Sequence, residues 1–82
     1  MNWYLYIVKC RDSSLYTGIT TNIERRIQEH NTKMGAKSLL GKLPVVFLYK
    51  EIFSNQKDAA RREREIKGWT RKKKLGLISY AT

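Results

Sequence analysis

Cysteine is almost absent from this sequence, which has one, Cys10, among 82 residues. A single cysteine excludes an internal disulfide framework, and it excludes zinc sites built from Cys-x-x-Cys pairs. A chain of this length can still bury a small hydrophobic core without cross-links. We therefore expect one domain over residues 1–82, in a reducing compartment.

Long apolar runs are also missing. The sequence has no stretch of about 18 consecutive apolar residues, and its first residues lack the basic and then apolar pattern of a secretory signal peptide. These absences favour a cytoplasmic protein that is not inserted in a membrane.

Acidic residues are scarce relative to basic ones. Seven Asp and Glu oppose 17 Lys and Arg, which gives a formal net charge of +10. Such an excess on a small domain attracts polyanions. Solubility alone is one explanation, and a membrane surface is another, but no segment shows the long helix with a large apolar face that is typical of membrane-surface binding. The composition favours nucleic acid as the partner.

The first part of the chain predicts a β-hairpin. Residues 3–9 are aromatic and β-branched, residues 11–14 form a polar turn, and residues 15–19 return as the partner strand. Alternation places Tyr16 and Gly18 on one face of the second strand. Gly18 either lets another group approach the backbone closely or marks a bulge.

A helix is predicted to follow the hairpin. Thr21 and Glu24 have the spacing of a capping box, and the helix is expected to end near residue 31. At about 100° per residue, Arg26 and His30 border its apolar face. Each has an ordinary explanation as well, because an arginine stem can cover a core and a histidine can hydrogen-bond at a helix end.

The middle of the chain predicts a loop and a third strand. Residues 31–42 lack periodicity and are rich in Gly, Lys and Ser, as loops are. Three lysines in this loop could contact phosphates, namely Lys33, Lys37 and Lys42. After Pro44, residues 45–53 carry the strongest strand signal in the chain.

A second helix is predicted from a cap at Ser54 or Asn55 through Lys67. Glu63 lies in the middle of its stripe of small and apolar residues. A carboxylate in that position has to be paired, hydrogen-bonded or bound to a metal. An ion pair with Arg26 or with a lysine is the ordinary explanation.

The C-terminal segment predicts a last short helix, capped by Thr70 and running from Arg71 to about Ile78. It begins with the basic run Arg71, Lys72, Lys73 and Lys74. This run is either a solvated face or a strip that binds phosphates.

Taken together, these motifs resemble the GIY-YIG nuclease domain. The ordered set that carries the resemblance is Tyr4-Leu5-Tyr6, Tyr16-Thr17-Gly18, Arg26, His30 and Glu63. The likeness is closest to the small stand-alone bacterial members, the UPF0213 group. The sequence departs from the family pattern at Tyr4, which stands where the family has glycine, and at Thr17, which stands where it has isoleucine.

The resemblance implies an α+β fold, with a small three-stranded antiparallel sheet of a hairpin and a third strand flanked by helices. It also implies an endonuclease that hydrolyses phosphodiester bonds in DNA with one Mg²⁺ or Mn²⁺, and that acts on branched or otherwise distorted structures. The residues expected to bind the nucleic acid are Lys33, Lys37, Lys42, Arg71, Lys72 and Lys73.

Carried over by position, Tyr16 would act as the general base or relay a proton from the attacking water. Tyr6 would form a hydrogen bond with Tyr16 and orient it. Because a free phenol is a weak base at neutral pH, Tyr16 would need cations nearby. Arg26 would stabilise charge on the phosphoryl oxygens. Glu63 would hold the metal, a hard cation that takes oxygen ligands. His30 would position the phosphate or the water.

Two alternatives to the nuclease remain open: a module that binds nucleic acid without cutting it, and a structural partner of ribonucleoprotein. Two phenols and a lone carboxylate mid-stripe favour the nuclease, because binding alone needs neither. A carboxylate near a phosphate makes sense only with a cation between them.

Overall fold

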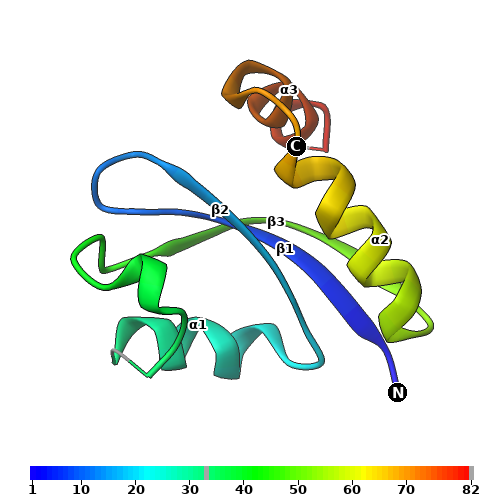
Figure 1. Cartoon of the computed structure of the whole chain (residues 1–82), viewed down its shortest axis with the longest axis horizontal. Coiled ribbons are helices and arrows are strands. Elements are labelled where there is room, and N and C mark those ends of the chain that lie inside the picture. The colour runs from blue at the N-terminus through cyan, green and yellow to red at the C-terminus, as the bar shows by residue number, and fades with distance from the viewer. Residues whose placement is uncertain (33, 82) are drawn as a thin grey trace.

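The computed structural model describes residues 1–32 and 34–81. Its strands are β1 (Trp3–Lys9), β2 (Leu15–Thr20) and β3 (Val46–Phe53), and they form one antiparallel sheet in the order β2-β1-β3. The first strand is therefore central, and the predicted α+β class is confirmed (Figure 1).

In the part of the chain that the structure describes, three α-helices and one short 3-10 turn accompany the sheet. They are α1 (Ile23–Asn31), η1 (Lys37–Leu39), α2 (Gln56–Lys67) and α3 (Arg71–Ala81). The segment predicted as a plain loop is thus partly ordered as η1, and α3 extends three residues beyond the expected end. Within the described residues, none of these helices has the length and apolar character needed to cross a bilayer.

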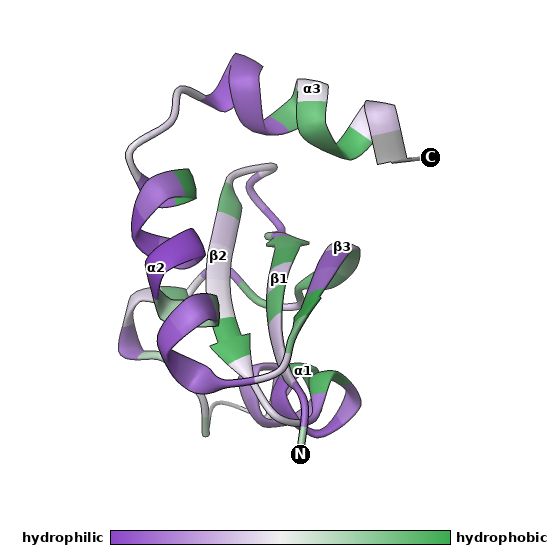
Figure 2. Ribbon diagram, turned by 90° about the vertical axis from the view of Figure 1, so that its right-hand side faces the viewer, coloured by the Kyte–Doolittle hydropathy of each residue, from purple (hydrophilic) through white to green (hydrophobic). Residues whose placement is uncertain are grey.

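The sheet separates two apolar clusters, one on each face. The first contains Tyr6 and Val8 of β1, and Ile23 and Ile27 of α1 pack against it. The second contains Leu5 and Ile7 of β1 with Ile66 of α2, and residues of α3 pack against it. The alternating side chains of β1 thus anchor α1 on one face and α2 with α3 on the other (Figures 1 and 2).

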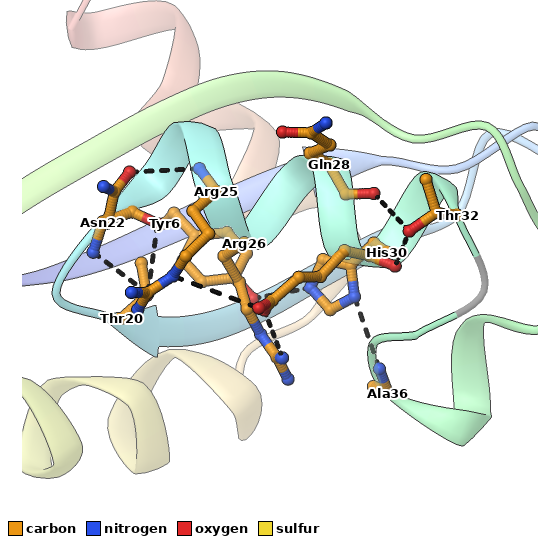
Figure 3. Close-up of polar contacts among 10 residues, drawn as sticks. Tyr6, Thr20, Asn22, Arg25, Arg26, Gln28, His30, Thr32 and Ala36 are labelled. Carbon is orange, nitrogen blue, oxygen red and sulfur yellow. Dashed lines mark hydrogen bonds and ion pairs between the residues drawn. The ribbon is translucent and has the colours of Figure 1, made fainter.

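The cap of α1 lies one residue later than predicted. Asn22, not Thr21, has the extended backbone of an N-cap, with φ −149° and ψ 103°. Its side-chain oxygen accepts the Arg25 backbone N–H at 3.0 Å (Figure 3). The Asn22 N–H in turn donates to the Thr20 hydroxyl oxygen at 3.1 Å, and this hydrogen bond fixes the chain as it leaves β2. Asn22 therefore caps the Arg25 N–H, one residue beyond the Glu24 N–H that a capping box from Thr21 would satisfy.

The orientation of α2 is fixed by a charged contact with β3. The Arg62 guanidinium donates to both carboxylate oxygens of Glu51, at 2.9 and 3.1 Å, and Tyr49 donates to the same carboxylate at 2.5 Å. Arg62 also lies over the Trp69 ring, 5.2 Å from its centroid. A bidentate, half-buried pair of this kind is more directional than a single surface contact. It holds one side of α2 against β3 and leaves the next residue, Glu63, directed elsewhere.

Candidate active site

A buried hydrogen bond between β1 and α1 forms the centre of the site. Tyr6 and His30 are each 1% exposed, and the Tyr6 hydroxyl lies 2.8 Å from His30 Nε2 (Figure 3). On the other side of the imidazole, Nδ1 accepts the Ala36 backbone N–H at 3.3 Å. Nδ1 therefore carries no proton, and in the neutral ring the proton is on Nε2.

This tautomer sets the direction of the Tyr6 hydrogen bond. His30 Nε2–H donates to the Tyr6 oxygen, so the phenolic hydrogen of Tyr6 remains for a second acceptor. Burial lowers the pKa of His30, and the nearby Arg26 charge lowers it further against the opposing effect of Glu29. The imidazole is thus kept in the neutral form that this arrangement requires.

The segment after α1 contributes to this centre, which the sequence pattern did not predict. A Cβ at position 35 would lie 2.1 Å from His30 Nδ1, so Gly35 is required for the chain to pass over the imidazole. Ala36 then supplies the N–H that fixes the tautomer. Neither residue has reactive chemistry, and the segment has no periodicity, so only the folded structure reveals the contact.

Tyr16 approaches the same centre from β2. Its ring centroid lies 6.4 Å from that of Tyr6 and 5.5 Å from that of His30, edge-on to the imidazole. Gly18 is the residue of β2 that faces Tyr6 in the register. A Cβ there would lie 2.6 Å from the Tyr6 hydroxyl oxygen, so the group for which Gly18 makes room is the phenol of Tyr6.

Arg26 borders the site as the helical wheel predicted. Its side chain is 32% exposed, whereas that of Arg25 is 60% exposed. The Arg26 guanidinium donates to Glu29 Oε1 at 3.1 Å, which forms an ion pair within α1. The pKa of Arg26 is raised, because hydrogen bonds to Glu29 and Tyr6 outweigh the opposing effect of burial. A permanently charged group therefore lies beside the Tyr6 phenol.

Glu63 reaches the site from α2. Its side chain is 20% exposed, and Oε2 pairs with Lys67 Nζ at 3.3 Å. The same Nζ lies 5.9 Å from the centroid of the Tyr16 ring. One lysine therefore lies near both the carboxylate of α2 and the phenol ring of β2, which brings these two groups together at the β2 edge of the sheet. The ion pair considered as the ordinary explanation is present, with Lys67 as the partner.

Several of these groups shift the pKa of Tyr6. It is raised to about 12, chiefly by burial and then by the neighbouring Tyr16, while Arg26 lowers it and the Glu63 charge raises it further. Side chains from β2, α1 and α2 thus all act on one phenol of β1. Tyr6 stays protonated at neutral pH, which suits a hydrogen-bond donor and not a proton acceptor.

The two departures from the family pattern lie apart from this centre. Tyr4 is half-buried, with Lys50 Nζ 5.7 Å from its ring centroid, and both line an open hollow of about 290 Å³ at the start of α1. Thr17 is 3% exposed and pairs with Ile7 in the register. Among the described residues its hydroxyl has no hydrogen-bond partner, as expected where threonine replaces an aliphatic side chain.

The basic residues predicted to bind nucleic acid differ in their exposure and in their contacts. Lys37 and Lys72 are exposed, and Lys42 lies 4.0 Å from Asp12. Arg71 donates to the Ser13 carbonyl at 2.5 Å, which brings the start of α3 to the hairpin turn. Lys73 lies 4.4 Å from the centroid of the Trp69 ring. Lys33 lies outside the described residues.

Known proteins are similar to this chain over most of its length. The model of the GIY-YIG catalytic domain matches residues 2–75. The chain belongs to the GIY-YIG family. This family membership indicates a nuclease-type function and an interaction with nucleic acid.

Relatives of the UPF0213 group match nearly the whole chain. A UPF0213 protein from Staphylococcus haemolyticus is 55% identical over 75 residues, which is 92% of each chain. One from Clostridium perfringens is 53% identical over 76 residues, covering 93% of this chain and 82% of the relative. The solution NMR structure of a UPF0213 protein from Bacillus halodurans has a TM-score of 0.63 at 41% identity, covering 98% of this chain and 85% of that one.

The donor set of this GIY-YIG chain limits how a metal could be held. The described residues contain no group of three or more His, Cys, Asp or Glu that could bind an ion. Glu63 is a single, largely buried carboxylate. Mg²⁺ often uses one carboxylate and takes water and substrate phosphate as its other ligands. The residues present therefore fit an ion that is completed by substrate, and not one held in a protein cage.

Proposed function

We propose that this protein is a divalent-metal-dependent endonuclease that hydrolyses phosphodiester bonds in DNA. The observation that carries the proposal is the convergence of two phenols, a guanidinium, an imidazole and a carboxylate from four different elements. Tyr6, Tyr16 and His30 contact one another, and Arg26 and Glu63 both act on the pKa of Tyr6.

The two phenols would have different tasks. Hydrolysis joins a water oxygen to phosphorus, breaks the bond to the leaving oxygen and transfers a proton from the water to that oxygen. Tyr6 is kept protonated by its raised pKa, so it would act as a hydrogen-bond donor that orients Tyr16. Tyr16 is the phenol left to accept or relay the proton of the water. His30 would act by holding Tyr6 in place.

The charged residues would serve the phosphate. Arg26 would stabilise negative charge on the phosphoryl oxygens in the transition state, where a fixed cation is most effective. Glu63 would hold one Mg²⁺ or Mn²⁺ together with the substrate. The ion would supply Lewis-acid polarisation of the phosphate and neutralise developing charge. The exposed lysines and the overall charge of +10 would attract the DNA backbone.

One observation favours the alternative of a binding module. Lys67 already provides Glu63 with a cation at 3.3 Å, so the carboxylate does not need a metal to be stable in the fold. A domain that only holds phosphates could use the same arrangement. The two functions differ in whether bound DNA is cut.

The test is a cleavage assay on single-stranded, duplex and branched DNA, with and without Mg²⁺ or Mn²⁺. Wild type is compared with Glu63→Gln and with Glu65→Gln, a matched control on the same helix whose side chain is 54% exposed. We expect metal-dependent scission, strongest on branched DNA, that falls more than about 100-fold in Glu63→Gln and stays unchanged in Glu65→Gln. Binding of every substrate without any scission would leave the binding module as the function.

A further inference from the structure

We propose that Lys67 is a resident counter-ion of Glu63, which a divalent cation has to displace before it can occupy the site. The inference rests on the proposed function, because it assumes that Glu63 is the carboxylate that holds the ion. It goes further by assigning a role to a residue that no motif includes.

The first argument is the difference in exposure between the two partners. The Glu63 side chain is 20% exposed, whereas that of Lys67 is 51% exposed. The carboxylate is thus held largely within the protein, and the ammonium reaches it from solvent on a flexible four-carbon stem. A lysine in this situation can leave its partner without disturbing the core, and the carboxylate cannot.

The second argument is the position of the ammonium. Lys67 Nζ lies 3.3 Å from Glu63 Oε2 and 5.9 Å from the centroid of the Tyr16 ring. It therefore occupies a position beside the Glu63 carboxylate, where the proposed function requires a cation, and within reach of the Tyr16 ring. An ammonium and a divalent ion cannot both sit there, because like charges repel strongly at such distances.

The third argument is the spacing along α2. Glu63 and Lys67 are four residues apart, with the glutamate N-terminal, which is the favourable order for an ion pair on a helix. The pair therefore forms from the helix alone, before any ligand arrives. It keeps Glu63 neutralised in the free protein, and it lowers the affinity for a divalent ion by the strength of the pair.

The experiment measures metal affinity directly, without using activity. Free Mn²⁺ is quantified by electron paramagnetic resonance in titrations of wild type, Lys67→Met and Glu63→Gln, each with the same excess of a dinucleotide whose phosphate completes the site, and in a titration of the dinucleotide alone. The matched control is Lys57→Met, which removes the same charge from an exposed position on the same helix. Lys67→Gln serves as a second variant, and thermal unfolding verifies that each variant is folded.

We expect Lys67→Met and Lys67→Gln to bind Mn²⁺ at least about 3-fold more tightly than Lys57→Met does. In wild type, added Mg²⁺ should also shift the NMR signal of the Lys67 ammonium and leave that of Lys57 unchanged. Equal affinities in the Lys67 and Lys57 variants, with binding still lost in Glu63→Gln, would overturn this inference alone. Binding that is unaffected by Glu63→Gln would overturn it together with the metal site of the proposed function.

Discussion

The limited space around the Tyr6 phenol determines which residues can occupy the neighbouring positions. Tyr6 is enclosed by Gly18 on the neighbouring strand and by His30 on α1, and His30 is covered in turn by Gly35. Because interiors are packed as densely as crystals of small molecules, an added methyl group at either glycine has nowhere to go. The glycine of the second motif is therefore explained by contact with the tyrosine of the first.

Gly18→Ala should destabilise the protein and displace the Tyr6 ring. The new Cβ would lie 2.6 Å from the hydroxyl oxygen and 2.8 Å from ring atom Cζ, which forces a shift that costs about 1–3 kcal/mol. Gly76→Ala is the matched control, because no atom lies within 4 Å of its added Cβ and alanine favours the helix. Urea unfolding measures both variants. A Gly18→Ala protein as stable as wild type would show that Tyr6 is not packed as described.

The raised pKa of Tyr6 predicts a loss of stability at high pH. The native pKa of about 12 exceeds the unfolded value near 10, so the unfolded state releases its proton first as the pH rises. The stability is complete below pH 10 and falls by about 2–3 kcal/mol as the pH passes 12. In a titration that follows tyrosinate absorbance, Tyr6→Phe should remove one group that titrates near pH 12. Tyr49→Phe should remove another, since the pKa of Tyr49 is also raised to about 12. A late transition that survives in Tyr6→Phe with full amplitude would contradict the assignment.

At the level of secondary structure, β1, β2, α1 and α2 each deliver one or two side chains to the site. β1 supplies Tyr6 while its alternate residues, Leu5 and Ile7, pack against Ile66 of α2. α1 supplies Arg26 and His30 from the edge of its apolar face. The periods of strand and helix are visible in the sequence, so the wheels and alternation identified the side of each element correctly.

Other features could not be read from these periods. The cap of α1 was assigned to Thr21, because the threonine-to-glutamate spacing matched, but the backbone bends at Asn22. The contacts of Gly35 and Ala36 with His30 depend on how the chain closes in three dimensions, and a loop without periodicity gives no signal for them in the sequence. The pair of Glu63 with Lys67 differs, because residues four apart on one helix are neighbours, and the expected ion pair of Glu63 with a lysine is present.

The position of the cap can be tested by a pair of neighbouring substitutions. Asn22→Ala removes the side-chain oxygen that accepts the Arg25 N–H, and should cost about 1 kcal/mol of stability. Thr21→Ala should cost only a few tenths, because Thr21 lies before the cap. Guanidinium unfolding of the two variants gives the comparison. If Thr21→Ala is the more damaging change, the capping box predicted from sequence is the correct description.

At the scale of the whole molecule, the site lies at the β2 edge of the sheet, between α1 on one face and α2 on the other. Arg71 links α3 to the hairpin turn through the Ser13 carbonyl, which places the basic start of α3 at the same end as the beginning of β2. Tyr16 is the second residue of that strand. A DNA backbone attracted by the charge of α3 would therefore arrive near the phenol proposed to take part in proton transfer.

The most direct measurement of the central claim is the single-turnover rate of DNA cleavage by Tyr16→Phe. This change removes one oxygen and keeps the ring that packs edge-on against His30. Tyr80→Phe is the control, because Tyr80 is 93% exposed. We predict that Tyr16→Phe binds DNA as wild type does but cuts at least about 100-fold more slowly, while Tyr80→Phe cuts normally. Cleavage by Tyr16→Phe at the wild-type rate would contradict the account.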